Sequence, residues 1–378
     1  MKRSRLAVSP VINAVAVVVV ALVVGGAAYY VGGSTVAPVT STTTSTFTTA
    51  QTVTQTSTTT QTSTATKTQS QFPTIINLAT LAGADVYYGA NDPTVAPFYT
   101  QNGLSPQWIT NPTETAGTLK NFVANGTVVG FAACADPLVA RANGLPVKII
   151  AAYVGTPASF AASLSSSTYT TMASLNGQKI GFGGVSASTI TANDRYWIYM
   201  ANKSGIQYTA VYLGNANSAL TPGQQLAALQ AGTVAAIATS DPGIYSMVAT
   251  GQLRVVAYAR DLLPTPWAAN CLFATDSIIQ SNPALVQAFV TASLQDVGYL
   301  SANPSYATSL YASKAGVSTA VATAGLALTQ YTPSGKGSGT DLVAAATNIF
   351  QAGLATGSIP AGTALNVASA VTTQFLGQ

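Results

Sequence analysis

The residues best suited to binding a small molecule are the glycines and hydroxyl residues between Ser174 and Thr189. A short apolar strand at 179–182 and a Gly-Gly turn precede a hydroxyl cluster that opens an expected helix. Helix N-termini carry unpaired backbone N–H groups, which suit an anion. We therefore predict that Ser186, Ser188 and Thr189 contact a ligand. The alternative is an ordinary helix N-cap cluster.

Two similar phrases flank this cluster. The first runs from Gly126-Thr127-Val128 through seven residues to Asp136-Pro137, and the second from Gly232-Thr233-Val234 through six residues to Asp241-Pro242. A strand followed by Asp-Pro, found twice, predicts two similar lobes that face one ligand. Asp136 and Asp241 are thus candidate ligand residues, although either carboxylate could simply cap a helix.

The composition excludes several classes of function. The chain has 378 residues, of which 6% are charged, and it has no histidine. A Ser-His-Asp triad, a Cys-His dyad and a His-ligated zinc site are therefore impossible, and histidine is the most common general acid–base residue. We expect a protein that is not an enzyme, with no metal ion and no cofactor.

The charge balance argues against a nucleic-acid partner. Four of the 14 basic residues precede the expected folded domain, and the remaining ten equal the ten acidic residues in number. A neutral domain does not offer a basic nucleic-acid-binding face. A low content of charged residues suits an acidic environment. Carboxylates are protonated there, so they no longer balance the positive charges of Lys and Arg, which repel one another. The alternative is an uncharged surface covered by a lattice or by glycans.

The N-terminus predicts a membrane anchor and a stalk. Residues 1–33 contain a basic start and an apolar run from Val11 to Val31, long enough to span a bilayer as a helix. The basic flank predicts that the rest of the chain lies outside the cell. Residues 34–72 form a Ser/Thr-rich stalk with too few apolar residues for a core, which predicts disorder and O-glycosylation.

The run from Arg5 to Ile12 resembles the start of archaeal type-IV-pilin-like signals. That resemblance implies cleavage after Ala7, with the apolar helix kept on the mature protein. The acidic residue usual in the mature helix is missing. An uncleaved signal anchor is the alternative, and either one tethers the protein to the membrane.

From about residue 73 to residue 378 the sequence is typical of a globular domain. Short apolar strands, such as 85–89, 128–133, 147–153 and 179–182, alternate with helical stretches as far as residue 274. This alternation predicts an α/β fold with parallel sheets. After residue 274 the chain is expected to be mostly helical.

Four residues in this domain are candidates for covalent modification. Asn125 and Asn202 begin N-glycosylation sequons. Cys134 and Cys271 lie in strand-like contexts, and an extracellular location would permit a disulfide between them. Two small buried side chains are the alternative.

The order of several phrases resembles the ABC-transporter solute-binding proteins of the nitrate/sulfonate/taurine type, over about 300 residues. That family implies the type II periplasmic-binding-protein fold, with two α/β lobes joined by two crossovers and a ligand in the cleft between them. Val129 and Ala235 replace the family's usual aspartates. The resemblance is carried by Phe98–Trp108, Asp136–Ala151, Leu175–Ile180, Gly184–Ser188, Leu229–Pro242 and Asn282–Ala288.

The resemblance implies lobe one at 76–156 plus 265–378 and lobe two at 157–264. Ligands of open α/β sheets bind at the carboxyl ends of strands, which adds Asn91 to the candidates. Tyr153 and Trp267 are candidates for apolar walls of the cleft, with core packing as the alternative. Arg195 is expected on a solvated helix face.

The expected function is a membrane-tethered extracellular protein that delivers a small ligand to an ABC permease. An oxyanion such as a sulfonate, sulfate or nitrate suits the helix N-terminus and stays ionised in acid. A structural cell-surface or pilin-like filament protein is the alternative. The related pyrimidine-precursor synthases are excluded, because they depend on a histidine that this chain lacks.

Overall fold

The structure is a computed structural model. It describes residues 41–48, 54–61, 76–81, 92, 94–95, 97–111, 116–187, 190–214, 220–357, 359 and 361–377. The chain divides into two compact units, Met1–Thr68 and Gln69–Gln378. The predicted anchor at residues 11–31 and the predicted strand at 85–89 lie outside the described residues.

The first unit contains a pair of strands that the sequence did not predict. Strands β1 (Ser41–Thr48) and β2 (Thr54–Gln61) pair antiparallel, with Ser41 opposite Gln61 and Thr48 opposite Thr54. The prediction of disorder was therefore wrong for these residues. That prediction rested on the lack of apolar residues and did not take into account the high strand propensity of β-branched threonine.

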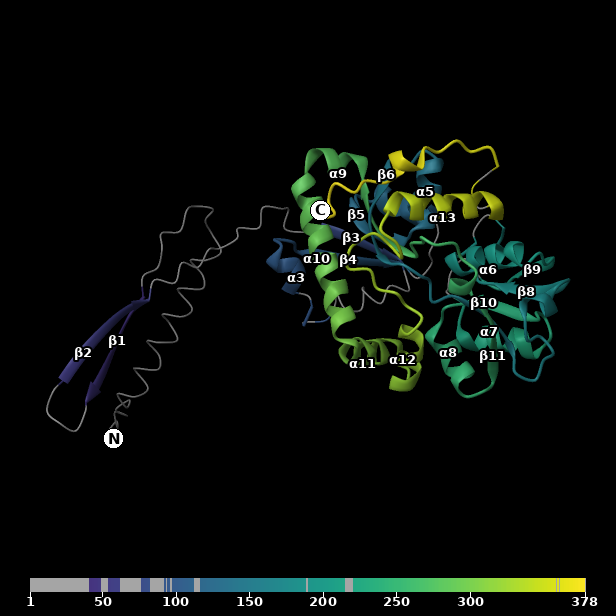
Figure 1. Ribbon diagram of the computed structural model, residues 1–378, viewed down its shortest axis with the longest axis horizontal. Helices are drawn as coiled ribbons and strands as arrows, with labels where there is room; N and C mark the ends of the chain where they lie inside the picture. Colours follow the sequence, from purple (N-terminus) through teal and green to yellow (C-terminus); the bar gives the residue numbers. More distant parts are fainter. Residues whose placement is uncertain are drawn as a thin grey trace, which may run out of the picture. The chain divides into compact units, whose positions relative to one another are not determined.

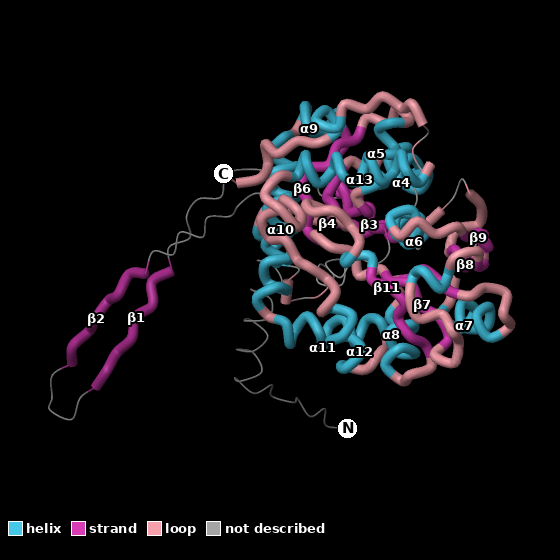
Figure 2. Tube along the Cα trace, turned by 45° about the vertical axis from the view of Figure 1, so that its right-hand side comes forward, coloured by secondary structure: helices cyan, strands magenta, loops and turns pink. Residues whose placement is uncertain are grey.

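The second unit contains two five-stranded sheets (Figures 1 and 2). The first sheet has the order β4-β3-β5-β12-β6 and the second has the order β11-β7-β10-β8-β9. The strands of the first sheet are β3 (Ile76–Leu81), β4 (Pro106–Asn111), β5 (Val129–Ala133), β6 (Val147–Val154) and β12 (Asn270–Thr275). Those of the second are β7 (Phe160–Leu164), β8 (Gln178–Phe182), β9 (Tyr208–Tyr212), β10 (Ala236–Thr239) and β11 (Leu253–Tyr258).

The sheets are mixed, which corrects the prediction of parallel sheets. Strand β7 pairs antiparallel with β10 and β11, and β12 pairs antiparallel with β5 and β6. Each of these strands is the first that the chain forms after passing from one sheet to the other, at residues 155–159 and 259–269. A strand that enters a sheet by such a crossing, without an intervening α-helix, is free to run antiparallel.

Helices follow most strands, as the alternation of the sequence predicts. Local signals set their starts, since α8 begins at Asp241-Pro242 and α10 at Asn282-Pro283. The helices of the strand-rich region are α3 (Pro97–Gln101), α4 (Ala116–Ala124), α5 (Ala135–Ala142), α6 (Ala192–Lys203), α7 (Pro222–Gln230) and α8 (Pro242–Ala249). The C-terminal helices are α9 (Asp276–Ser281), α10 (Pro283–Ala302), α11 (Pro304–Ala315), α12 (Thr319–Leu326) and α13 (Leu342–Thr356).

The C-terminal helices cover both halves of the unit (Figure 1). Helices α10 and α13 bury Phe289, Val290, Ile349 and other apolar residues in the core of the first sheet. Helix α12 packs against α8, and its Val321 joins the core of the second sheet. Helix α13 packs against both α5 and α6. The C-terminal region therefore holds the two halves together on two sides, while the predicted lobe boundaries stay a prediction.

Candidate ligand-binding site

An ion pair joins a helix of the first half to a helix of the second. Arg195 Nη1 on α6 donates to Asp136 Oδ1 in the first turn of α5, at 2.8 Å. The Asp136 side chain is 0% exposed and that of Arg195 is 11% exposed. A buried pair of this kind depends on close geometry, because removing two charges from water costs several kcal/mol per ion.

Arg195 also borders a pocket between the two halves. Its walls come from α5, α6, α13 and the crossover segment that ends at β12, and most of the lining is apolar or aromatic. The lining residues are Ala133, Ala135, Val139, Ala192, Arg195, Tyr196, Tyr199, Trp267, Ala268, Ile349, Ala352, Gly353, Thr356 and Ile359. A pocket with apolar walls and few polar groups is typical of small-molecule sites.

Trp267 forms an aromatic wall of this pocket together with α6. Its ring centroid lies 5.9 Å from that of Tyr199 and 6.3 Å from that of Tyr196. Its backbone is held from both sides, because Trp267 N donates to Ser338 Oγ at 2.7 Å and Ser338 N donates to Trp267 O at 2.8 Å. The backbone that carries the indole is therefore held in place by two hydrogen bonds.

Three buried polar atoms at this site have no hydrogen-bond partner in the described part of the chain. They are Arg195 Nε, Asp136 Oδ2 and Trp267 Nε1. Buried polar groups are nearly always paired, and each unpaired one costs about 1–3 kcal/mol. Two of these atoms belong to side chains that line the pocket, and the third belongs to Asp136, the ion-pair partner of Arg195.

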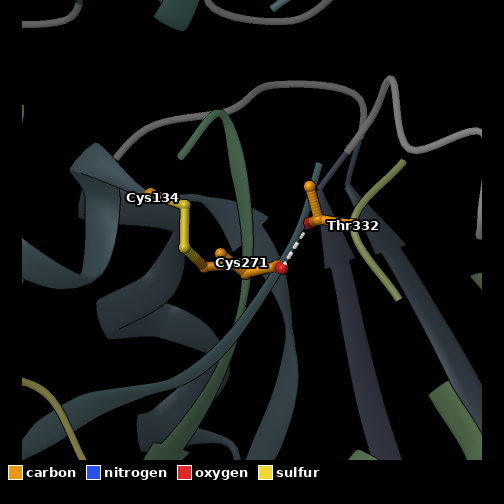
Figure 3. The surroundings of a disulfide bond; sticks show 4 residues. Cys134, Cys271 and Thr332 are labelled. Atoms are coloured by element: carbon orange, nitrogen blue, oxygen red, sulfur yellow. Dashed lines mark hydrogen bonds between the residues drawn. A yellow bond between two sulfur atoms is a disulfide. The ribbon is translucent and has the colours of Figure 1, made fainter. Parts of the chain in front are cut away.

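A disulfide fixes the start of α5 to the first sheet (Figure 3). Cys134, the residue before α5, is bonded to Cys271 on β12, and Cys134 N also donates to Ala269 O at 2.9 Å. Beside the disulfide, Thr332 Oγ1 donates to Ala152 O at 2.7 Å (Figure 3). The disulfide therefore sets the position of Asp136, two residues after Cys134, against the crossover segment that carries Trp267.

The predicted anion site at Gly183-Gly184 is filled by the protein's own carboxylate. Asp194 accepts hydrogen bonds from Gly183 N at 2.8 Å, Gly184 N at 2.9 Å and Thr191 N at 2.8 Å. The expectation of free N–H groups there was wrong, because Thr191 and Asp194 form a capping box that starts α6 at Ala192. The Thr-Ala-Asn-Asp sequence of 191–194 carries that signal. Burial raises the pKa of Asp194, although its three backbone hydrogen bonds act in the opposite direction.

Two of the predicted ligand residues lie in the region of the pocket. Trp267 lines the pocket, and Asp136 is the ion-pair partner of Arg195, which also lines it. Tyr153 is completely buried at the end of β6, with its ring edge-to-face against Phe131. Ser186 is half-buried in the loop after β8. Asn91, Ser188 and Thr189 lie outside the described residues.

Asp241 acts as the N-cap of α8, where its Oδ1 accepts from Gly243 N at 2.7 Å. Burial raises the pKa of this carboxyl. The neighbouring Ser240 Oγ accepts from Asn193 Nδ2 at 3.3 Å, which places the loop after β10 beside the first turn of α6. Both sequon asparagines are exposed, and Asn202 Nδ2 donates to Ala355 O at 3.0 Å.

Arg195 is the residue that sequence reasoning missed, because it was expected on a solvated helix face. Residues Ala192, Arg195, Tyr196 and Tyr199 are spaced three and four apart, so they share one face of α6, and all four line the pocket. That spacing was visible in the sequence. What it faces was not, because α5 and α13 come from distant parts of the chain.

The two mixed sheets, their crossing connections and the pocket between them define a class, the two-lobed binding proteins of the periplasmic-binding-protein fold. Residues 95–307, more than half of the chain, match the family model described as NMT1/THI5 like. The chain therefore belongs to the NMT1/THI5-like family of solute-binding proteins, as the sequence resemblance predicts. A comparison with curated protein sequences gives no match.

Solved structures of low identity share the fold. The alkanesulfonate-binding protein SsuA from Xanthomonas axonopodis pv. citri, bound to MOPS, has a TM-score of 0.63 at 20% identity, covering 80% of this chain and 99% of its own. The periplasmic aliphatic sulphonate binding protein SsuA from Escherichia coli has 0.61 at 19%, covering 81% and 95%. The Candida albicans CA3427 product, described as having the generic periplasmic binding protein fold, has 0.63 at 14%, covering 81% and 98%.

Proposed function

We propose that the protein captures a small organic oxyanion outside the cell and delivers it to an ABC permease. The observation that carries this proposal is the pocket at Arg195, where Nε of a buried guanidinium has no partner among the described residues and lies beside aromatic walls. The family is one of binding proteins, which supports capture without chemical change.

The chemistry of the pocket supports an anion with an apolar body. Arg195 Nε and Trp267 Nε1 are donors without partners in the described part of the chain, and both suit sulfonate oxygens. Tyr196, Tyr199 and Ile349 provide surface for an aromatic or alkyl group. The two SsuA structures are, by their descriptions, of alkanesulfonate- and aliphatic sulphonate-binding proteins, which supports a sulfonate as the ligand.

The arrangement of the helices that line the pocket supports capture of the ligand by closure of the two halves. Helix α5 follows a strand of the first sheet, α6 follows a strand of the second, and the pocket touches both. A ligand that contacts both halves favours the conformation in which they are close together. The segments 155–159 and 259–269 connect the sheets and are the places where a hinge would lie.

The proposed location is the outer face of a membrane, with residues 11–31 as the anchor and 34–72 as the spacer. The apolar composition of residues 11–31 supports this part of the proposal. Among the described residues, no helix is both long enough and apolar enough to cross a bilayer. Alkaline extraction of membranes that contain the full chain and a chain lacking residues 1–33 tests the anchor, because only the former should remain in the pellet.

A thermal-shift screen of the full chain in mild detergent tests the binding function. Because a ligand that binds only the folded state raises the melting temperature, we expect stabilisation by benzenesulfonate and similar organic sulfonates. Sodium sulfate and nitrate at equal ionic strength are the matched controls and should stabilise less, because they leave the apolar walls uncovered. Stabilisation by sugars or amines, with none by any oxyanion, would contradict the proposal.

A further inference from the structure

Asp136 is the second charged group of the pocket region, and the described residues satisfy only one oxygen of its carboxylate. The side chain is 0% exposed, Oδ1 accepts from Arg195, and Oδ2 has no hydrogen-bond partner among the residues that the structure describes. A buried carboxylate is tolerated when a counter-charge faces it. Arg195 provides that charge, so the pair is neutral as a unit.

The other charged groups on neighbouring elements do not replace Arg195. On α5 itself, Arg141 pairs with Asp276 at 2.7 Å. Lys120 on α4 is exposed, and Lys148 and Tyr153 are the ionisable residues of β6. Helix α13 and the turn at 367–370, which also pack against α5, contain no ionisable residue. On α6, Asp194 is bonded to backbone N–H groups, while Tyr196 and Tyr199 line the pocket.

An anion that binds Arg195 therefore changes the charge balance of a buried site. One guanidinium would then face two negative groups, the ligand and Asp136, inside a region with little access to water. Like charges that share such a site favour protonation of one of them. A sulfonate is a strong acid and keeps its charge, so the proton must go to the carboxyl group.

We propose that binding of an organic anion in this pocket takes up one proton, and that Asp136 Oδ2 receives it. This inference rests on the proposed function, because it concerns the regulation of the same site. The balance is simple: the anion and one proton enter together, and no bond of the ligand breaks. Binding is then tighter in acid and release is favoured near neutral pH.

Isothermal titration calorimetry of the full chain with sodium benzenesulfonate tests the proposal. Titrations in imidazole and in bis-tris, cationic buffers with different ionisation enthalpies, give the number of protons taken up. We expect about one proton, and an affinity that rises as the pH falls. Benzenesulfonamide, a neutral probe of similar shape, should bind with no proton uptake.

Asp136→Asn is the decisive variant, because it keeps an oxygen for Arg195 and removes the negative charge. We expect it to bind benzenesulfonate at about neutral pH at least tenfold more tightly than the wild type, with no proton uptake. Asp276→Asn, which removes the partner of Arg141, is the matched control and should keep the wild-type pH dependence. The wild-type proton count stands by itself if Asp136→Asn does not fold.

The outcomes separate this inference from the proposed function. Tight binding of benzenesulfonate by the wild type without proton uptake, and with an affinity that does not change with pH, overturns the inference and leaves the function intact. Proton uptake that persists in Asp136→Asn overturns the assignment to Asp136. If neither the wild type nor Asp136→Asn binds benzenesulfonate or benzenesulfonamide at any pH, the proposed function is overturned together with the inference.

Discussion

At the scale of residues, the proposed binding of an anion depends on Arg195, and its ion-pair partner Asp136 opposes that binding near neutral pH. The pair is buried, so removing one partner alone leaves an uncompensated charge and costs about 3–5 kcal/mol of stability. Replacing both partners by apolar residues of similar size is often neutral for stability. The two properties of the pair, binding and stability, can therefore be separated by mutation.

We predict that the double variant Arg195→Met/Asp136→Leu folds with a free energy of unfolding within about 1–2 kcal/mol of the wild type. Its affinity for benzenesulfonate should fall by about 100-fold or more, because charge-assisted hydrogen bonds to Arg195 are lost. Urea unfolding and calorimetry measure the two quantities. Wild-type affinity in a folded double variant would show that the anion binds elsewhere.

At the scale of elements, the disulfide and the crossover segment at 259–269 position the residues around the pocket. Cys134–Cys271 ties α5 to β12 and closes a loop that spans a sequence separation of 137 residues. We predict that Cys134→Ala/Cys271→Ala lowers the free energy of unfolding by about 2–5 kcal/mol. It should also weaken ligand binding, because the first turn of α5 is no longer held against the segment that carries Trp267.

Urea unfolding and calorimetry of the double cysteine variant check this prediction. Dithiothreitol treatment of the wild type should reproduce both effects, and the same treatment of the variant, which has no cysteine left, should change nothing. A variant with unchanged affinity but reduced stability would restrict the disulfide to a structural role.

Elements with local signals could be predicted from the sequence, and elements set by distant contacts could not. Helix α10 begins at Pro283 after the Asn282 N-cap, as these two helix-start residues predict. Strand β7 was not predicted, while the segment of β12 was predicted as strand-like around Cys271. The antiparallel direction of both strands was not predicted, because it arises from passing between the sheets. The position of Arg195 at the pocket was missed for the same reason, since α13 reaches α6 only in the folded chain.

At the scale of the whole molecule, the scarcity of charge is combined with carboxyl groups that favour their neutral form. Burial raises the pKa of Asp194 and Asp241, and it raises that of Asp296 well above the usual range. Both oxygens of Asp296 lack hydrogen-bond partners in the described residues. Asp92 differs, since its pKa is lowered although burial acts in the opposite direction, and Thr94 N donates to its Oδ1 at 2.8 Å.

A raised pKa in the folded state means that stability is greatest where the group is protonated in both states. The contribution of these three aspartates is therefore fully present below about pH 4 and is lost as the pH rises through their folded-state values. We predict that the melting temperature rises as the pH falls from about 7 to about 4.

Asp296→Asn is the control for this prediction, because an amide cannot ionise. It should stabilise the chain by about 1 kcal/mol or more at about pH 7 and change little at about pH 3. Circular dichroism melts at a series of pH values give both results. A stability that falls steadily on acidification would contradict the account of acid adaptation.

The most direct test of the central claim is a crystal structure of the chain grown with benzenesulfonate. The account predicts that the sulfonate lies within hydrogen-bond distance of Arg195 Nε and Trp267 Nε1, with the ring against Tyr196 and Tyr199. A sulfonate bound away from Arg195, in a structure where the pocket between the two halves stays free of ligand, would contradict it.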